Sequence, residues 1–404
     1  MEEKYRAMQK KSLRKYQVLA VGAFAIFFTG FPHIWSIYQP YVLEYTGWSK
    51  EQTSLCFYIY FVVFVFGNIL GGRLQDRYSP RMPVLIGGGI FTLSLFLSAF
   101  GFRSSPIFLY VTYGILQGVG QGMIYSTIIS TAQKWYPEKP GFASGVIVTA
   151  NGLFGFFMAP VCRNLLESVG LKGNFLVMGT LVGISWLFSR WLIDNPPDIE
   201  KGEKVLETDK IDFRPSEMLH SREFYLLTVT MLFGLIPYML VSPVAQIIQT
   251  DRGVADAVAV AAVMGGSVCN AIARLAVPSI ADRAGRISSL SAVLGVLVFS
   301  MVALTVAPRA LVSPAVILLY GCYGGIMGSF PALTSCIFGM KHSGENYGYV
   351  LLGLAAATFS APLITRVVYR VSLTEEVLFF VGAASGLAAL LTLFVLSRRL
   401  GREV

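Results

Sequence analysis

Twelve runs of about 20 predominantly apolar residues recur along this chain of 404 residues, and they restrict its fold more than any other feature. A run of this length is what an α-helix needs to cross the hydrocarbon core of a bilayer. The sequence therefore predicts an all-α integral membrane protein with twelve transmembrane helices. These helices are expected near 16–40, 52–74, 82–102, 106–134, 141–166, 172–194, 222–248, 256–281, 287–308, 312–340, 345–370 and 374–398.

The composition agrees with this class. Hydrophobic residues make up 54% of the chain and charged residues 14%, whereas soluble domains carry roughly a quarter charged residues. The net charge of +9 does not require a nucleic-acid partner. If the N-terminus is cytoplasmic, most of the 32 Lys and Arg residues fall in segments on the cytoplasmic side, as the positive-inside rule demands. We expect a multi-pass protein of the plasma or inner membrane with both termini in the cytoplasm.

The two halves of the chain repeat one another. An Asp-Arg turn follows the second apolar run and another follows the eighth, about half a chain apart. This repeat predicts two six-helix halves, 1–194 and 222–404, joined by a polar cytoplasmic linker at 195–221. We expect the charged turns to pin helix ends by charge-assisted hydrogen bonds and to act as gates. Their residues are Asp76, Arg77, Arg81, Asp282, Arg283 and Arg286.

One full charge, Arg274, lies deep inside the eighth apolar run. An arginine in a bilayer costs about 2.5–3.5 kcal/mol on insertion scales, so such residues usually serve function. Asn270 precedes it by one helical turn and shares its face. A guanidinium can bind a carboxylate through two parallel hydrogen bonds. We predict that Arg274 receives an anionic substrate rather than a structural acid, because the cores of the apolar runs contain no Asp or Glu.

A ladder of polar side chains marks the fourth apolar run. Tyr113, Gln117, Gln121 and Tyr125 are each four residues apart, which keeps them roughly on one helix face. Interleaved glycines would let a neighbouring helix approach closely. The ladder therefore predicts either a substrate-binding face or a hydrogen-bonded seam between helices. His33, which follows Pro32 in the first run, is either a packing group or a proton carrier.

Stretches in both halves resemble the major facilitator superfamily, and more narrowly the oxalate:formate antiporters and the related monocarboxylate transporters. The resemblance implies a two-half transporter fold with its site near the membrane midplane, a substrate-contacting tyrosine at Tyr125, an aromatic wall at Tyr323 and a substrate contact at or near His33. The stretches are GFPHIWSIYQPYV, GVGQGMIYS, KWYPEKPGFASG, SEMLHSREFY, NAIARLAVPSIADRAGR, YGGIMGSFPAL and ENYGYVLLG, together with the turn around Asp76.

The chain departs from these relatives at two positions. The oxalate-exchanging branch has a lysine in the eleventh helix where this chain has Leu354. Animal monocarboxylate transporters have an aspartate one turn before the arginine, where this chain has Asn270. The first departure argues against dicarboxylates. The second leaves the route of the proton open, with His33 as the first candidate and Asp251 as an outer relay.

Charge then decides the expected substrate. A dianion against one arginine would leave about one negative charge uncompensated in a site of low dielectric, at a cost of several kcal/mol. We therefore predict a secondary transporter of a small monocarboxylate such as lactate, pyruvate or formate, coupled to a proton. The alternatives are exchange of a dicarboxylate for a monocarboxylate, with His33 protonated in place of the missing lysine, and an anion sensor that does not transport.

Enzyme chemistry is not expected from this sequence. It shows no nucleophile–base constellation, no phosphate-binding loop and no metal-ligand spacing among its five cysteines. We expect no cofactor and no metal. The expected partners are a small organic anion, a proton and the lipid bilayer, and the protein is expected to work as a monomer.

Overall fold

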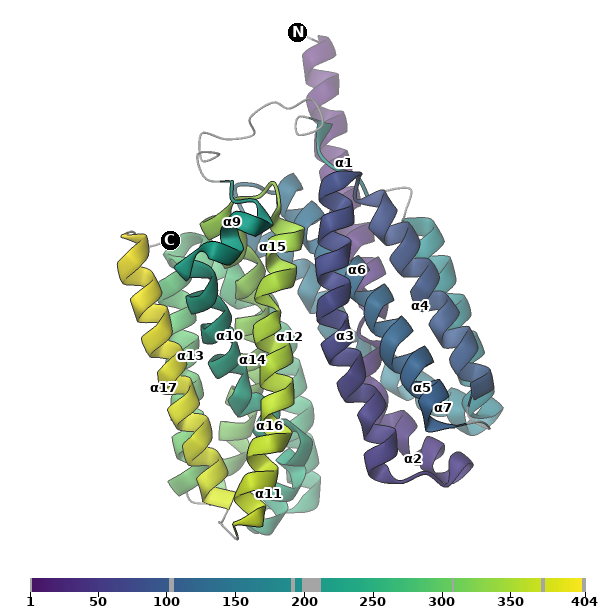
Figure 1. The fold of residues 1–404 in the computed structure, drawn as a ribbon, viewed down its shortest axis with the longest axis vertical. Helices are drawn as coiled ribbons and strands as arrows, with labels where there is room; N and C mark the ends of the chain where they lie inside the picture. Colours follow the sequence, from purple (N-terminus) through teal and green to yellow (C-terminus); the bar gives the residue numbers. More distant parts are fainter. Residues whose placement is uncertain are drawn as a thin grey trace. The chain divides into compact units, whose positions relative to one another are not determined.

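The computed structural model describes residues 2–101, 105–189, 193–197, 212–306, 309–371 and 375–401, and all their regular structure is helical (Figure 1). Ten helices within these ranges are long and apolar enough to cross a membrane. One of them, α7 (Pro140–Ser189), contains two of the expected runs and bends between them at Gly170, where φ is 71°. The prediction of an all-α membrane protein is confirmed.

The first compact unit comprises Met1–Asp212 together with Phe338–Tyr349. Helix α6 is its central element and packs against α1, α3, α4 and α7. Its core is built around buried aromatic rings, among them Phe91, Phe154 and Phe175. The helices before α7 are α1 (Glu2–Phe28), the 3₁₀ turn η1 (Phe31–Ile34), α2 (Trp35–Thr46), α3 (Lys50–Arg77), α4 (Arg81–Gly101), α5 (Pro106–Leu109), the π-helical turn η2 (Tyr110–Leu116) and α6 (Gln117–Trp135).

The first expected run is broken in the middle. Helix α1 ends at Phe28, and η1 contains Pro32, which has no backbone N–H to continue an α-helix. The break lies against α7, because a Cβ added to Gly30 would come within 2.4 Å of the carbonyl oxygen of Asn151. Asn151 also donates a hydrogen bond to the hydroxyl of Thr29 at 3.0 Å. The interruption is thus held in place by α7.

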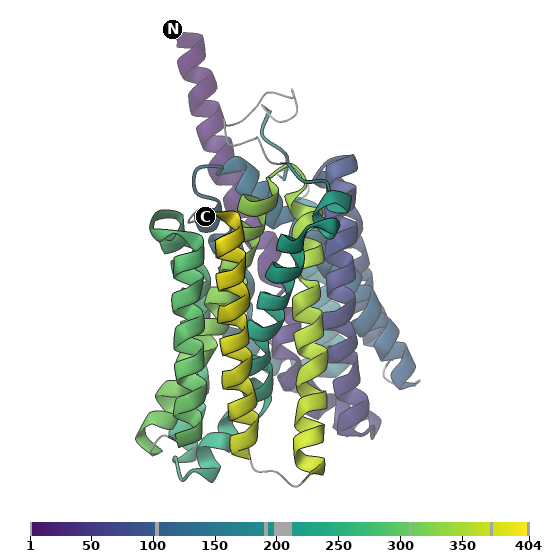
Figure 2. The same cartoon turned by 60° about the vertical axis from the view of Figure 1, so that its left-hand side comes forward.

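The second compact unit comprises Phe213–Ile337 and Val350–Val404. Helix α10 packs against α16 and α17, and α13 packs against α12 and α17. Figure 2 shows α17 in yellow beside α10 in teal. The helices are α9 (Pro215–His220), α10 (Arg222–Val241), the 3₁₀ turn η3 (Ser242–Val244), α11 (Ala245–Asp251), α12 (Asp256–Ala284), α13 (Arg286–Val306), α14 (Arg309–Phe338), α16 (Leu352–Arg370) and α17 (Glu375–Leu400).

The outer faces of both units are apolar. Large side chains such as Phe66, Phe156, Phe299, Phe359 and Leu391 are more than half exposed. An exposed apolar surface of this kind suits helices surrounded by lipid tails. Other polar side chains of the same helices, such as Asn68, Asn151 and Ser300, are buried inside the units, which is where a functional site can be built.

The compact units differ from the two halves of the sequence at one segment. Residues Phe338–Tyr349 lie in the second half of the chain but fold with the first unit. They contain all of α15 (Ser343–Val350) except its last residue. The expected linker at 195–221 includes residues 198–211, which lie outside the described residues. Its end forms α9, so the division at 1–194 and 222–404 stays a prediction from the repeat.

Candidate functional site

Arg274 is buried in the middle of α12, at 2% exposure. Its Nε donates a hydrogen bond to Oδ1 of Asn270 at 2.9 Å, so the two side chains meet across one helical turn. Pro278 lies one turn further on and has no N–H to offer the carbonyl of Arg274. The helix is therefore locally weakened where it carries its charge, and contacts from other helices must hold the arginine.

Helix α14 supplies one of these contacts by a very close approach to α12. A Cβ added to Gly324 would lie 2.2 Å from the carbonyl oxygen of Asn270. One added to Gly328 would lie 2.4 Å from the carbonyl oxygen of Arg274. Only glycine fits at these two positions, which lie four residues apart on one face of α14. The backbone of α14 thus fits against the turn of α12 that carries Asn270 and Arg274.

Aromatic rings complete the surroundings of the arginine. The guanidinium carbon of Arg274 lies 5.6 Å from the ring centroid of Tyr323 on α14. Tyr238 on α10 stacks on Tyr323, with centroids 3.9 Å apart and planes 14° from parallel. Tyr320 meets Tyr238 edge to face at 5.1 Å. A cation near the face of a ring is stabilised by the ring's negative quadrupole, so this ring stack both positions the guanidinium and stabilises its charge.

The predicted ladder on α6 is buried in the first unit. Gln121 accepts a hydrogen bond from the Tyr60 hydroxyl of α3 at 2.5 Å. The ring of Tyr125 meets Phe64, also on α3, edge to face at 5.3 Å. Glycines between the ladder residues allow this packing, since a Cβ on Gly122 would lie 2.2 Å from the carbonyl oxygen of Phe64. The lower part of the ladder therefore packs as a helix–helix seam, and its role in substrate binding stays a prediction.

The upper part of the ladder is different. Both side-chain polar atoms of Gln117 are buried without a hydrogen-bond partner among the described residues, and so is the Tyr113 hydroxyl. The indole N–H of Trp35 is also buried without a hydrogen-bond partner among the described residues. The centroid of the Trp35 ring lies 4.5 Å from the centroid of the Tyr113 ring. Buried polar groups without a partner cost about 1–3 kcal/mol each. These groups gather next to the π-helical turn η2, a distortion that is frequent at functional sites.

The two expected proton carriers lie in different units. His33 belongs to the 3₁₀ turn η1 of the first unit, and its side chain is not among those that the structure describes. Asp251 is the last residue of α11 and is exposed. Leu354, the position of the missing lysine, is buried in α16. None of the described contacts links Asp251 to Arg274, so its role as a relay stays a prediction.

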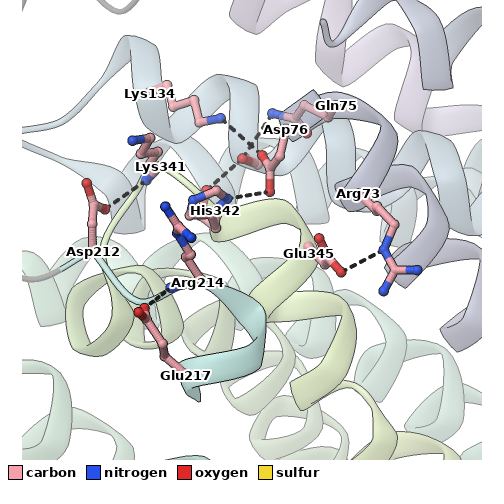
Figure 3. A network of polar contacts seen from close by, with 12 residues as sticks. Arg73, Gln75, Asp76, Lys134, Asp212, Arg214, Glu217, Lys341, His342 and Glu345 are labelled. Atoms are coloured by element: carbon pink, nitrogen blue, oxygen red, sulfur yellow. Dashed lines mark hydrogen bonds and ion pairs between the residues drawn. The ribbon is translucent and has the colours of Figure 1, made fainter. Parts of the chain in front are cut away.

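The charged turn of the first unit forms a network with the α14–α15 segment (Phe338–Tyr349), shown in Figure 3. Asp76 lies 3.8 Å from Nζ of Lys134 and 3.3 Å from Nδ1 of His342. Arg73 forms an ion pair with Glu345 at 3.1 Å. Two further gate residues behave differently: Arg81 pairs with Asp194, and Arg77 lies over the ring of Tyr78.

The charged turn of the second unit contains an ion pair between two of its own residues. Asp282 pairs with Arg286 at 3.0 Å, one helical turn away. Arg286 also donates a hydrogen bond to the sulfur of Cys336 at 3.5 Å, and Arg283 is exposed. The two turns are therefore alike in sequence but not in their contacts. Their role as gates stays a prediction, and these contacts name the side chains that each gate would use.

Several residues of these clusters were not identified from the sequence. Trp35, Tyr60 and Tyr238 are aromatic residues in apolar runs, and nothing in their spacing distinguishes them from packing residues. Lys134 and His342 are remote from Asp76 in the sequence, so only the fold shows the contact. Within the described ranges no three His, Cys, Asp or Glu side chains come together as a possible metal site.

Comparisons with known proteins agree with this architecture. Residues 19–362 match the family model described as Major Facilitator Superfamily. The chain is 28% identical to the oxalate:formate antiporter of Oxalobacter formigenes, over 85% of this chain and 82% of that protein. It is 25% identical to the uncharacterized MFS-type transporter YhjX of Escherichia coli (strain K12), over 81% of each.

Among solved structures, the proton:xylose symporter XylE bound to 6-bromo-6-deoxy-D-glucose is similar. The TM-score is 0.73 at 14% identity, covering 95% of this chain and 96% of that one. A likeness at this identity shows the fold alone. Together with the relatives, it confirms the family resemblance predicted from the sequence motifs.

Proposed function

The chain belongs to the major facilitator superfamily, so it is a multi-pass secondary transporter rather than an enzyme, and from this premise we propose that it carries a small monocarboxylate such as lactate, pyruvate or formate. The observation that carries the proposal is Arg274, a cation buried in a helix apolar enough to cross a membrane. Asn270 and the ring of Tyr323 orient its guanidinium. The similarity to an oxalate:formate antiporter supports an organic anion.

Charge favours a monoanion over a dianion. One arginine neutralises one carboxylate, and a second carboxylate in a site of low dielectric would cost several kcal/mol. Leu354 cannot offer a second cation, because it is apolar and buried. A small monocarboxylate therefore fits the charge of the second unit better than oxalate does.

Two polar side chains of the first unit are further candidates for substrate binding. The amide of Gln117 and the hydroxyl of Tyr113 can each donate and accept hydrogen bonds, and neither has a partner among the described residues. A 2-hydroxyl or 2-oxo group would satisfy them, whereas formate has no such group. Gln121 and Tyr125 continue the same face of α6. This supports lactate-like or pyruvate-like acids over formate.

Proton coupling is the next part of the proposal. A site that moves a proton together with the anion keeps the same net charge loaded and empty, so neither step moves an extra charge across the membrane potential. His33 is the proposed carrier and Asp251 the alternative. We also propose that both termini are cytoplasmic, from the distribution of Lys and Arg, and that the monomer is the working unit.

The second candidate is exchange of a dicarboxylate for a monocarboxylate, and the similarity to the oxalate:formate antiporter favours it. Protonated His33 would then supply the second positive charge. The two candidates differ in what drives uptake. Exchange needs a counter-substrate inside the vesicle, whereas proton symport needs only a pH gradient.

Purified protein in proteoliposomes tests these possibilities together. We expect labelled lactate to accumulate in empty vesicles when the outside is made more acidic, and oxalate not to accumulate. Uptake that requires internal formate or oxalate would identify the antiporter instead. Binding of lactate, measured as a thermal shift, without uptake under either condition would identify an anion sensor and contradict the transport proposal.

A further inference from the structure

The α14–α15 segment is bound to the first unit along its backbone. A Cβ added to Gly72 of α3 would lie 2.1 Å from the backbone nitrogen of Glu345. One added to Gly348 would lie 2.8 Å from the backbone nitrogen of Ile69, also on α3. Glycines on both sides therefore allow the two backbones to touch. Contact this close is lost at once if the segment moves outward.

Polar contacts secure the same surface. The hydroxyls of Ser343 and Ser130 share a hydrogen bond at 2.6 Å, and Gln75 donates to Ser130 at 3.2 Å. Arg73 pairs with Glu345 at 3.1 Å. Serine and glutamine do not change charge in the physiological pH range, and the Arg73–Glu345 pair is internally neutral. Protonation of Glu345 by acid can only weaken its pair with Arg73, so none of these contacts strengthens as the pH falls.

Asp76 provides a contact on this surface that can strengthen as the pH falls. Its side chain is 7% exposed, and its Oδ1 accepts no hydrogen bond among the described residues. The nearest cation to Oδ1 is Lys134, 5% exposed, at the long distance of 3.8 Å. The Oδ2 atom faces Nδ1 of His342 at 3.3 Å. A buried carboxylate so weakly compensated is stabilised by any additional positive charge beside it.

The charges around His342 can be accounted for group by group. Asp76 and Lys134 face it from α3 and α6, and Glu345 from its own segment is paired with Arg73. Lys341 is exposed, and its backbone N–H donates to the exposed Asp212 at 3.3 Å. Asp212 is exposed to solvent, and among the described residues Lys134 is the buried cation that faces Asp76. Protonation of His342 would supply the second positive charge.

We propose that His342, Asp76 and Lys134 form a proton-binding site, and that a proton on His342 holds the α14–α15 segment on the first unit. In the sequence, the segment joins α14 to α16 of the second unit. Binding of the proton and docking of the segment favour each other by linkage. The inference concerns the first unit alone and stands whether or not Arg274 binds a carboxylate.

Hydrogen exchange of the segment tests the proposal without any substrate. Full-length protein in lipid nanodiscs is exchanged at about pH 5.5 and about pH 8, either side of the range in which histidine changes charge. Rates for the peptide that covers 338–349 are divided by the chemical exchange rate at each pH. We expect exchange to be about fivefold slower at the acidic pH, the factor that a partly exposed ion pair of about 1 kcal/mol supplies.

Substitutions of His342 separate the effect of its charge from the effect of its side-chain shape. His342→Gln should exchange rapidly at both pH values, and His342→Lys, which keeps a positive charge at both, should exchange slowly at both. Asp76→Asn should also abolish the pH dependence. The control is His220→Gln, since His220 is exposed and its hydrogen bond among the described residues is to Ser216 of its own helix. A pH response that survives in His342→Gln, or its absence from the wild type, would overturn the proposal.

Discussion

Arg274 is a charged residue in a membrane helix, and nearby side chains offset the free-energy cost of placing its charge there. Its guanidinium is held by a neutral amide at 2.9 Å and by the face of a tyrosine ring. The ring belongs to a stack whose second member, Tyr238, comes from a third helix. Such contacts orient the guanidinium. A planar guanidinium can bind a carboxylate through two parallel hydrogen bonds, which a lysine ammonium cannot do.

Gln117 offers the clearest prediction at the scale of one residue. Replacing it with Leu removes a buried amide without partners among the described residues, so the free energy of unfolding without substrate should rise by about 1 kcal/mol. Affinity for lactate should fall, while affinity for formate should not. Thermal unfolding with and without each acid measures both effects.

Gln121→Leu is the matched control for that variant, because this change breaks a formed hydrogen bond to Tyr60. It should lower the unfolding temperature. If both variants change stability in the same direction, the amide of Gln117 is satisfied in the folded protein and its assignment to the substrate is wrong.

Leu354 carries a second prediction. Leu354→Lys supplies the cation that the oxalate-exchanging relatives have at this position, so binding of oxalate should improve relative to lactate. The ratio of the two dissociation constants, measured by competition, checks this. An unchanged ratio would show that the side chain at this position has no access to the substrate.

At the scale of the helices, some features of the fold can be predicted from the sequence and others cannot. Runs of apolar residues place the membrane helices, and Pro32 and Pro243 mark where the first and seventh runs break into 3₁₀ turns. The π-helical turn at Tyr110–Leu116 has no such marker. The Asn270–Arg274 contact follows from helical spacing alone, whereas the Tyr238–Tyr323 and Asp76–His342 contacts join distant segments that only tertiary packing brings together.

A prediction at this scale concerns the contact between α12 and α14. Gly328→Ala would force a methyl group against the carbonyl oxygen of Arg274 and should destabilise the protein by about 1–3 kcal/mol. It should also weaken substrate binding by displacing the arginine. Gly295→Ala in α13 is the control, since a Cβ there meets nothing within 4 Å and should be neutral or stabilising. Equal unfolding temperatures for the two variants would contradict the close approach.

The transport cycle proposed for the whole molecule moves an anion together with a proton. The proposed carrier on η1, His33, keeps the charge of the loaded and empty site equal when it takes up a proton with the anion. His33→Gln should therefore abolish accumulation driven by a pH gradient while leaving exchange of one lactate for another intact. Proteoliposome uptake with imposed gradients measures this, and undiminished accumulation would shift the role to Asp251.

The central claim is that Arg274 binds the carboxylate, and direct binding to purified protein tests it. Truncating one partner of a buried charge pair costs about 2–5 kcal/mol, so Arg274→Ala should weaken lactate binding at least about thirtyfold. Arg274→Lys should recover it only in part, and Arg370→Ala, at an exposed arginine that ends α16, should bind as the wild type does. Lactate binding of wild-type strength in a folded Arg274→Ala variant would contradict the account.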